Sequence, residues 1–231
     1  MRLASKTGHA PTVAFAHFHK AVFEMVRLDP FSAKPHAETC IALGHVHGIS
    51  IWQLLGPVVR SWAVGSLEGP EAGLDEMRRS IASCREQELR IGLVWLLPHF
   101  ALAQAEAGQI DDAIETIAAA TAELDGAHFW DPEVYRIRGD ILLKRDPANV
   151  APGEQALLAA IAVARQQKAR GFELRAALSL AKLYQATGRP TEARDILTPA
   201  LEEFDPTPEM PEIAEAQSIL AMLAQGQASP E

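Results

Sequence analysis

Residues 172–204, FELRAALSLAKLYQATGRPTEARDILTPALEEF, carry the pattern of two helices joined by a tight turn. Apolar and small residues recur every three or four positions on both sides of Gly188, which is the spacing of one helix face. Gly188 can adopt the left-handed conformation that ends a helix. Pro190 fits the first turn of the next helix, because its missing N–H needs no helical partner there. This stretch therefore predicts a helical hairpin.

The same arrangement recurs along the chain with a period of roughly forty residues, the signature of a repeat protein. A small residue suited to a close helix crossing stands at Ala21, Ser61, Ala101, Gly139 and Ala181, at intervals of 40, 40, 38 and 42 residues. The last unit follows the tetratricopeptide pattern, with Tyr184 after the crossing residue and Ala193 in the second helix. We expect an all-α, tetratricopeptide-like right-handed superhelical solenoid of about five helical hairpins plus a C-terminal closing helix.

We expect these repeats to form a single domain over residues 1–231. Its units cover approximately residues 11–47, 51–88, 91–127, 131–169 and 172–204, and the closing helix covers 212–225. In the fourth unit, Asp131 is expected to cap the first helix, with Pro132 in its first position, and a longer surface loop runs over residues 144–153. Pro98 is expected to kink the first helix of the third unit.

Composition limits the possible functions. The chain is 48% hydrophobic and has a formal charge of −9, so its surface as a whole repels a phosphate backbone and nucleic-acid binding is disfavoured. Cys40 and Cys84 lack CxxC spacing and are expected to be small buried hydrophobes, which suits a reducing cytoplasm. The sequence contains neither a signal core nor an apolar run long enough to span a membrane.

The first unit is unusually apolar for the end of a repeat array. It contains Phe15, Phe18, Val22, Phe23 and Met25 within one predicted helix. A solenoid normally ends in a polar capping repeat, because each unit buries its apolar face only against its neighbours. We therefore expect this unit to be covered by something upstream, or to be a docking surface.

Three segments resemble one particular family: residues 50–67, residues 129–142 (FWDPEVYRIRGDIL) and residues 164–177. They are similar to the C-terminal repeat region of large bacterial predicted ATPases. The resemblance covers nearly the whole chain and is most specific over residues 164–204. In that family the repeats follow an AAA-type or related nucleotide-binding module, which itself follows an adenylate/guanylate cyclase domain or a DNA-binding, transcriptional-regulator domain.

The resemblance implies a regulatory or sensing region that holds a partner or controls an upstream domain. A free-standing adaptor that binds a peptide or helix is the alternative. Neither reading needs a cofactor, and the chain lacks the G-x-x-x-x-G-K-[ST] phosphate loop of a nucleotide site. We expect no catalytic residues in this chain.

Histidines crowd the first unit, which raises the remote alternative of a metal-dependent enzyme. His17 with His19, and His45 with His47, are pairs two positions apart. On a helix such pairs point in different directions, whereas residues four apart share a face and can grip one ion. We therefore expect no metal site. Adjacent acids such as Asp111 and Asp112 diverge in the same way and are expected to be solvated.

The first helix of each hairpin should line the concave face, where a partner would bind. Counting from the crossing residues gives an apolar half, with Phe15, Phe18, Leu55, Val58, Trp62 and Trp95, and a charged half, with Arg136, Asp140, Lys144, Arg175, Lys182 and Gln185. Such a groove could anchor a peptide or helix by burial and fix its register by charge. The simpler interpretation is that the aromatics are core and the charges are a solvated face.

Overall fold

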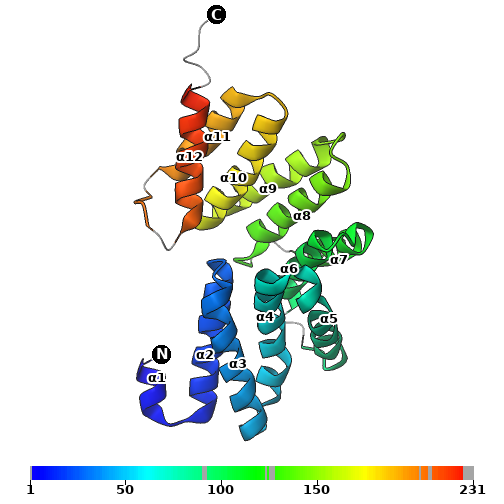
Figure 1. Cartoon of the computed structure of the whole chain (residues 1–231), viewed down its shortest axis with the longest axis vertical. Coiled ribbons are helices and arrows are strands. Elements are labelled where there is room, and N and C mark those ends of the chain that lie inside the picture. The colour runs from blue at the N-terminus through cyan, green and yellow to red at the C-terminus, as the bar shows by residue number, and fades with distance from the viewer. Residues whose placement is uncertain are drawn as a thin grey trace, which may run out of the picture. The chain divides into compact units, whose positions relative to one another are not determined.

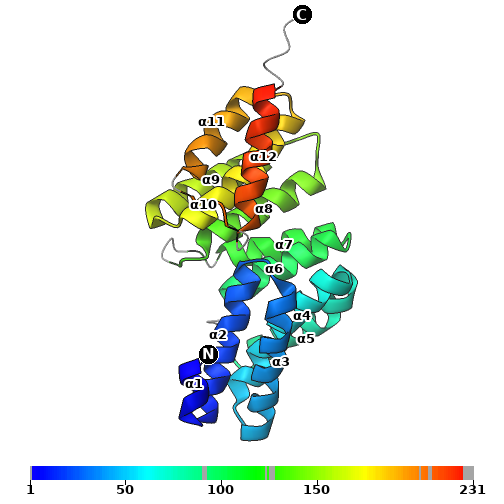
Figure 2. The same cartoon turned by 60° about the vertical axis from the view of Figure 1, so that its left-hand side comes forward.

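The computed structural model describes residues 2–89, 93–122, 124, 128–202, 204–207 and 210–225. Within these residues the chain is all-α and contains no strand, as the sequence predicted. Figures 1 and 2 show the helices, whose bounds are α1 Arg2–Thr7, α2 Ala10–Val26, α3 Pro30–His47, α4 Ser50–Glu68, α5 Pro70–Glu86, α6 Leu93–Glu106, α7 Ile110–Ala122, α8 Asp131–Arg145, α9 Ala151–Gln167, α10 Arg170–Ala186, α11 Pro190–Leu201 and α12 Pro211–Gln225. Each of the five predicted repeat ranges holds two helices, and α12 occupies the predicted closing helix.

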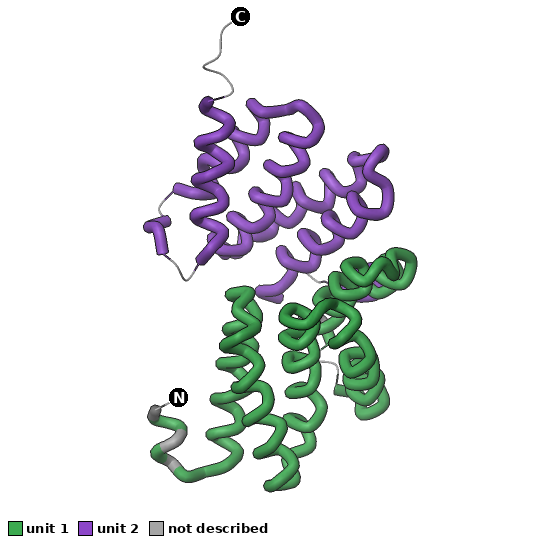
Figure 3. The backbone as a smooth tube through the Cα atoms, viewed as in Figure 1, with its two compact units in different colours: residues 1–116 green, residues 117–231 purple. Residues whose placement is uncertain are grey.

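The helices group into two compact units, residues 1–116 and 117–231, which Figure 3 colours separately. In the first unit, α2 packs on α3 and α4, α3 on α4, and α4 on α5. In the second unit, α8 packs on α9, α10 contacts α8, α9 and α11, and α12 packs on α10 and α11. The expectation of one continuous domain stays a prediction.

The turn chemistry read from the sequence is confirmed at the last hairpin. Gly188 has φ of +71° between α10 and α11, and Pro190 opens α11. The predicted cap at Asp131 is wrong, because Asp131 is the first residue of α8 and Trp130 holds the cap position. The Asp131 carboxylate instead accepts a hydrogen bond from the backbone N–H of His128 at 3.3 Å. A carboxylate cap does occur at Asp29, which accepts from the backbone N–H of Ser32 at 3.0 Å at the start of α3.

All five predicted crossing residues are buried, as a close helix crossing requires. Ala21, Ser61, Ala101 and Ala181 are each 0% exposed, and Gly139 is also buried. A close approach lies between α4 and α5, where a Cβ added to Gly73 would stand 2.1 Å from the carbonyl oxygen of Ser61. Only a residue without a side chain fits at this crossing, so the small residues set how closely the helices pack.

Apolar side chains between the helices form the core of each unit. In the second unit a continuous cluster joins α9, α10, α11 and α12 through residues such as Leu157, Leu174, Leu180, Leu197 and Ile213. The longer loop predicted over residues 144–153 is exposed from Lys144 to Asn149, but α9 already begins at Ala151 and Gly153 is buried. The described helices include none that is both long and apolar enough to cross a membrane.

Candidate interaction surfaces

Three of the six apolar residues predicted for the groove belong to the core. Phe18, Leu55 and Val58 are only 5%, 4% and 1% exposed, so these three residues are not available to line a groove. These residues are buried because α2 and α4 pack between other helices of the first unit. Trp62 is half-buried, and the side chain of Trp95 lies outside the described residues. Phe15, by contrast, is 52% exposed.

Phe15 belongs to an exposed row of aromatic side chains on α2, which we call the α2 ridge and define as Phe15, His19 and Phe23. These residues are four positions apart and therefore share one helix face. Phe23 is 53% exposed, and the centroids of the Phe15 and His19 rings are 3.9 Å apart. The Phe15 ring also meets the buried Trp52 ring of α4 edge-on, at 6.1 Å. The ridge is thus held in place from below while its outer side faces solvent.

Cationic side chains flank the α2 ridge. The Lys20 ammonium and the Arg27 guanidinium lie 5.1 Å and 5.7 Å from the centroid of the Phe23 ring. Both cations pair with the carboxylate of Glu24, and the distance from Arg27 Nη1 to Glu24 Oε2 is 2.8 Å. The side chain of Glu24 is only 3% exposed, whereas those of Lys20 and Arg27 are 36% and 26% exposed. Glu24 therefore lies beneath the two cations, and Arg27 also acts electrostatically on the carboxylate of Asp29.

Most of the exposed large hydrophobic side chains among the described residues belong to the first unit. In the first unit they are Leu3, Phe15, Phe23, Leu28, Phe31, Val46 and Ile51, all within α1 to the start of α4. Among the described residues of the second unit they are Phe129, Leu158 and Met222. Apolar side chains that gather on a surface mark an interaction site, whereas scattered ones need no explanation.

The charged half of the predicted groove lies in the second unit and is engaged in ion pairs. Arg136 donates two hydrogen bonds to Glu133, at 2.9 Å and 2.7 Å, and one to Asp140 at 2.5 Å. Burial opposes the charged form of Arg136, but the two carboxylates outweigh it and raise the pKa of the guanidinium. Burial also raises the pKa of Asp140, an effect that the nearby Arg136 opposes.

This network extends from α8 to α10 and α12. Arg175 of α10 donates from Nε to Glu212 of α12 at 2.6 Å, and Lys182 pairs with Glu215 at 2.7 Å. The side chains of Arg175 and Glu212 are 12% and 9% exposed, while those of Lys182 and Glu215 are about half exposed. The buried pair thus serves to fasten α12 to α10, and Lys182 stays accessible.

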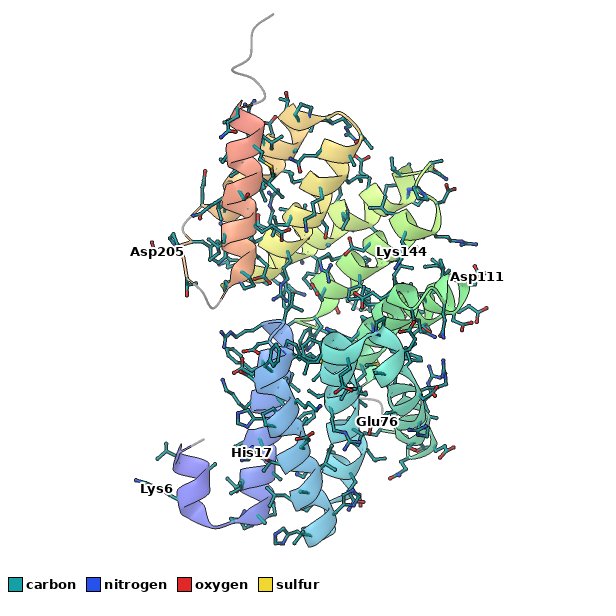
Figure 4. The ribbon with its side chains drawn as sticks, viewed as in Figure 1. Lys6, His17, Glu76, Asp111, Lys144 and Asp205 are labelled. Atoms are coloured by element: carbon teal, nitrogen blue, oxygen red, sulfur yellow. The ribbon has the colours of Figure 1, made fainter. Side chains whose placement is uncertain are left out.

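The remaining predicted groove residues lie at the border of this network. Gln185 is half-buried toward the end of α10, and Lys144 is exposed near the end of α8, where Figure 4 labels it. The acids Asp111 and Asp112 are exposed at the start of α7, as predicted. Six of the twelve residues that the sequence assigned to the groove belong to the first unit and six to the second, so a groove that joins them stays a prediction.

A histidine pair that the sequence did not reveal joins α2 to α3. The Nδ1 atoms of His17 and His36 lie 3.0 Å apart, so the two rings share a hydrogen bond; Figure 4 labels His17. Burial is the main cause that lowers the pKa of both histidines. Repulsion by the His36 ring lowers the pKa of His17 further, and the positive charge of Lys20 lowers that of His36 further. Elsewhere His45 and His47 are exposed. The part of the chain that the structure describes holds no group of three or more residues suited to a metal ion.

Both cysteines are buried free thiols, as predicted. Burial raises the pKa of the Cys40 thiol to about 12 and also raises the pKa of Cys84. Since the thiolate is the nucleophile, neither residue is set up for nucleophilic chemistry at neutral pH.

An open pocket of about 830 Å³ lies in the second unit between α9, α10 and α11. Its walls are charged, but Arg165 and Arg170 both pair with the buried carboxylate of Glu173, at 2.8 Å and 2.7 Å. Arg170 also donates to backbone carbonyls at the end of α11, including that of Glu202 at 2.8 Å. These hydrogen bonds join three helices, so the charges around the pocket have a structural role.

Comparison of the chain with protein-family models gave no match, and comparison with curated proteins gave none either.

Proposed function

We propose that this chain is a protein-interaction module whose contact surface is the α2 ridge. The observation that carries the proposal is the half exposure of Phe15 and Phe23 on one face of α2. A buried aromatic ring is a strong anchor in protein interfaces, and such anchors dominate binding energy. If a partner covered the exposed half of each ring, the removal of apolar surface from water would contribute roughly 1 kcal/mol per residue to the free energy of binding.

The α2 ridge replaces the concave groove as the site of binding in this proposal. The charged residues of the second unit already neutralise one another, so a partner gains little by displacing them. Phe15 and Phe23 are instead about half exposed, and Trp52 supports the Phe15 ring from within. Preorganised aromatic side chains bind at a lower entropic cost than mobile ones.

The resemblance to the repeat region of bacterial predicted ATPases suggests what this module serves. In our proposal it is the regulatory repeat region of a cytoplasmic signalling ATPase with a cyclase or DNA-binding output domain. The alternative is a free-standing adaptor. An antibody against this chain distinguishes the two, because the native product is much larger than 25.0 kDa in the first case and has this mass in the second.

Affinity capture from the native cells tests the binding surface. The variant Phe15→Ser/Phe23→Ser removes the ridge, and Leu158→Ser/Met222→Ser removes two exposed apolar residues of the second unit as a matched control. We expect the first variant alone to lose the proteins that the parent captures, while both variants keep the parent's circular dichroism. If the two double variants capture the same proteins as the parent, the ridge is not the contact surface.

A further inference from the structure

The paired histidines of α2 and α3 stand at the edge of a packed helix interface. The residues one helical turn before and after each histidine are small and 0% exposed: Ala14 and Ala21 around His17, and Ala33 and Cys40 around His36. The two rings are themselves half-buried. Their backbones are therefore fixed by the packed helices, while the rings remain within reach of solvent.

We propose that His17 and His36 bind a zinc ion between α2 and α3. Their Nδ1 atoms lie 3.0 Å apart. Imidazole nitrogen is a good zinc ligand, and two such nitrogens held by one tetrahedral ion at about 2.0–2.1 Å stand about 3.3–3.4 Å apart. The two rings therefore need to separate by only about 0.3–0.4 Å to accept the ion.

Zinc would take the place of the hydrogen bond between the two rings. In that bond one Nδ1 donates its hydrogen and the other accepts it. When both Nδ1 lone pairs bind zinc, the donating ring carries its hydrogen on Nε2 instead, so neither ring gains or loses a proton. Because the described residues offer no group of three or more metal-binding side chains, we expect water to fill the other zinc positions. The site is thus weaker than a structural zinc site with four protein ligands.

Three other histidines of α2 and α3 lack this arrangement. Nδ1 of His19 donates to the backbone carbonyl of Phe15 on its own helix, at 2.9 Å. His45 and His47 are exposed on α3 and lie two positions apart, so their side chains diverge. A single imidazole offers one ligand, whereas the pair between α2 and α3 offers two at a separation that the fold sets.

Charged side chains beside the pair act in opposite directions. Lys20 opposes positive charge at His36, whereas Glu24 favours it. Lys20 and Glu24 also form an ion pair with each other. Their effects on a cation held by the two rings therefore partly cancel.

Calorimetric titration of the intact chain with zinc chloride tests the proposal at about pH 7.5, where an ordinary histidine is neutral. We expect one zinc ion to bind per parent chain, and binding to be at least ~10-fold weaker for His17→Gln and for His36→Gln, since even a residue that only supports a ligand contributes that much. His45→Gln is the matched control and should bind zinc like the parent. Magnesium, which prefers oxygen ligands, should not bind to the pair. Because zinc would bind only the folded hairpin, it should also raise the melting temperature of the parent but not that of His36→Gln.

Imidazole ¹⁵N spectra of the parent provide a readout that needs no variant and does not depend on what the α2 ridge contacts. Zinc should shift the Nδ1 signals of His17 and His36 and leave those of the other histidines nearly unchanged. The proposal is overturned if the parent does not bind zinc, if both variants bind it as tightly as the parent, or if zinc shifts only the signals of other histidines. If either variant lacks the parent's circular dichroism, the nitrogen spectra decide alone.

Discussion

Arg175 of α10 donates a hydrogen bond from Nε to the Glu212 carboxylate of α12 at 2.6 Å, and both side chains are almost fully buried. This pair fastens the closing helix to the last hairpin beside the apolar contacts of Ile213 and Ile219. Two charges removed from water together are stable only while each compensates the other.

Loss of one partner of this pair should destabilise the second unit. We predict that Arg175→Ala lowers the free energy of unfolding by about 3 kcal/mol, because Glu212 is left charged and buried. Lys182→Ala is the matched control on the same helix, since its pair with Glu215 is half exposed and should be worth less than about 1 kcal/mol. Urea denaturation followed by circular dichroism measures the free energy of unfolding of both variants. Equal losses for the two variants would mean that Arg175 and Glu212 are not a buried pair.

The crossing of α4 and α5 predicts opposite effects for two neighbouring glycines. Gly73→Ala places a Cβ 2.1 Å from the Ser61 carbonyl oxygen, so the helices must move apart at a cost of about 1–3 kcal/mol or more. Gly65→Ala meets its nearest atom at 3.6 Å, an ordinary contact, and should be neutral or stabilise by up to about 1 kcal/mol through helix propensity. Thermal denaturation ranks the variants. A Gly73→Ala protein as stable as Gly65→Ala would disprove the close crossing.

The histidine pair between α2 and α3 predicts a pH-dependent stability. The pKa of His17 and of His36 is lowered in the folded chain, so below about pH 6.5 the unfolded chain binds more protons than the folded one. Stability is therefore complete above this pH and falls as the pH drops toward the folded pKa values. Lys20 and Glu24 also face the pair, with opposite effects on His36.

Replacement of one histidine should flatten this dependence. We expect His36→Gln to lose less stability than the parent between pH 7.5 and pH 5.5, roughly one unit either side of an ordinary histidine pKa. His45→Gln, at an exposed position of α3, should follow the parent. Melting temperatures recorded across this range give the comparison. Parallel curves for the parent and His36→Gln would show that the pair does not couple protonation to folding.

The two thiols should be inert in the folded protein. Because burial raises the pKa of Cys40 to about 12, and also that of Cys84, almost no thiolate forms at neutral pH. We predict very slow maleimide labelling of the native chain, read by mass spectrometry, and rapid addition of two labels in denaturant. Fast labelling of the native chain at either cysteine would contradict their burial.

Much of the fold could be predicted because its signals are local. The spacing of Ala21, Ser61, Ala101, Gly139 and Ala181 predicts a small buried residue in each hairpin, and all five are buried. The turn at Gly188 and the start of α11 at Pro190 could be predicted because both follow from the backbone conformation that each residue favours. The sequence predicted Asp131 as the capping residue, whereas it is the first residue of α8 and Trp130 holds the cap position. The two positions differ by a single residue, which sequence alone does not resolve.

The candidate surfaces could be predicted only in part. Counting from the crossing residue identifies a helix face, but it does not reveal which neighbours cover that face, so Leu55 and Val58 were assigned to a groove although they are core. Arg175 meets Glu212 from 37 positions away, and no local pattern indicates that pairing. His17 and His36 lie on consecutive helices but at unequal distances from the turn at Leu28, so counting outward from that turn does not pair them.

The central claim, that the α2 ridge contacts another protein, is tested most directly by photo-crosslinking in the native cells. A benzophenone amino acid replaces Phe23 in one variant and Leu158 in another, since both positions are exposed and apolar. We predict that position 23 joins to one recurring protein, identified by mass spectrometry, and that position 158 does not. Identical background products at both positions would contradict the assignment of α2 as the binding surface.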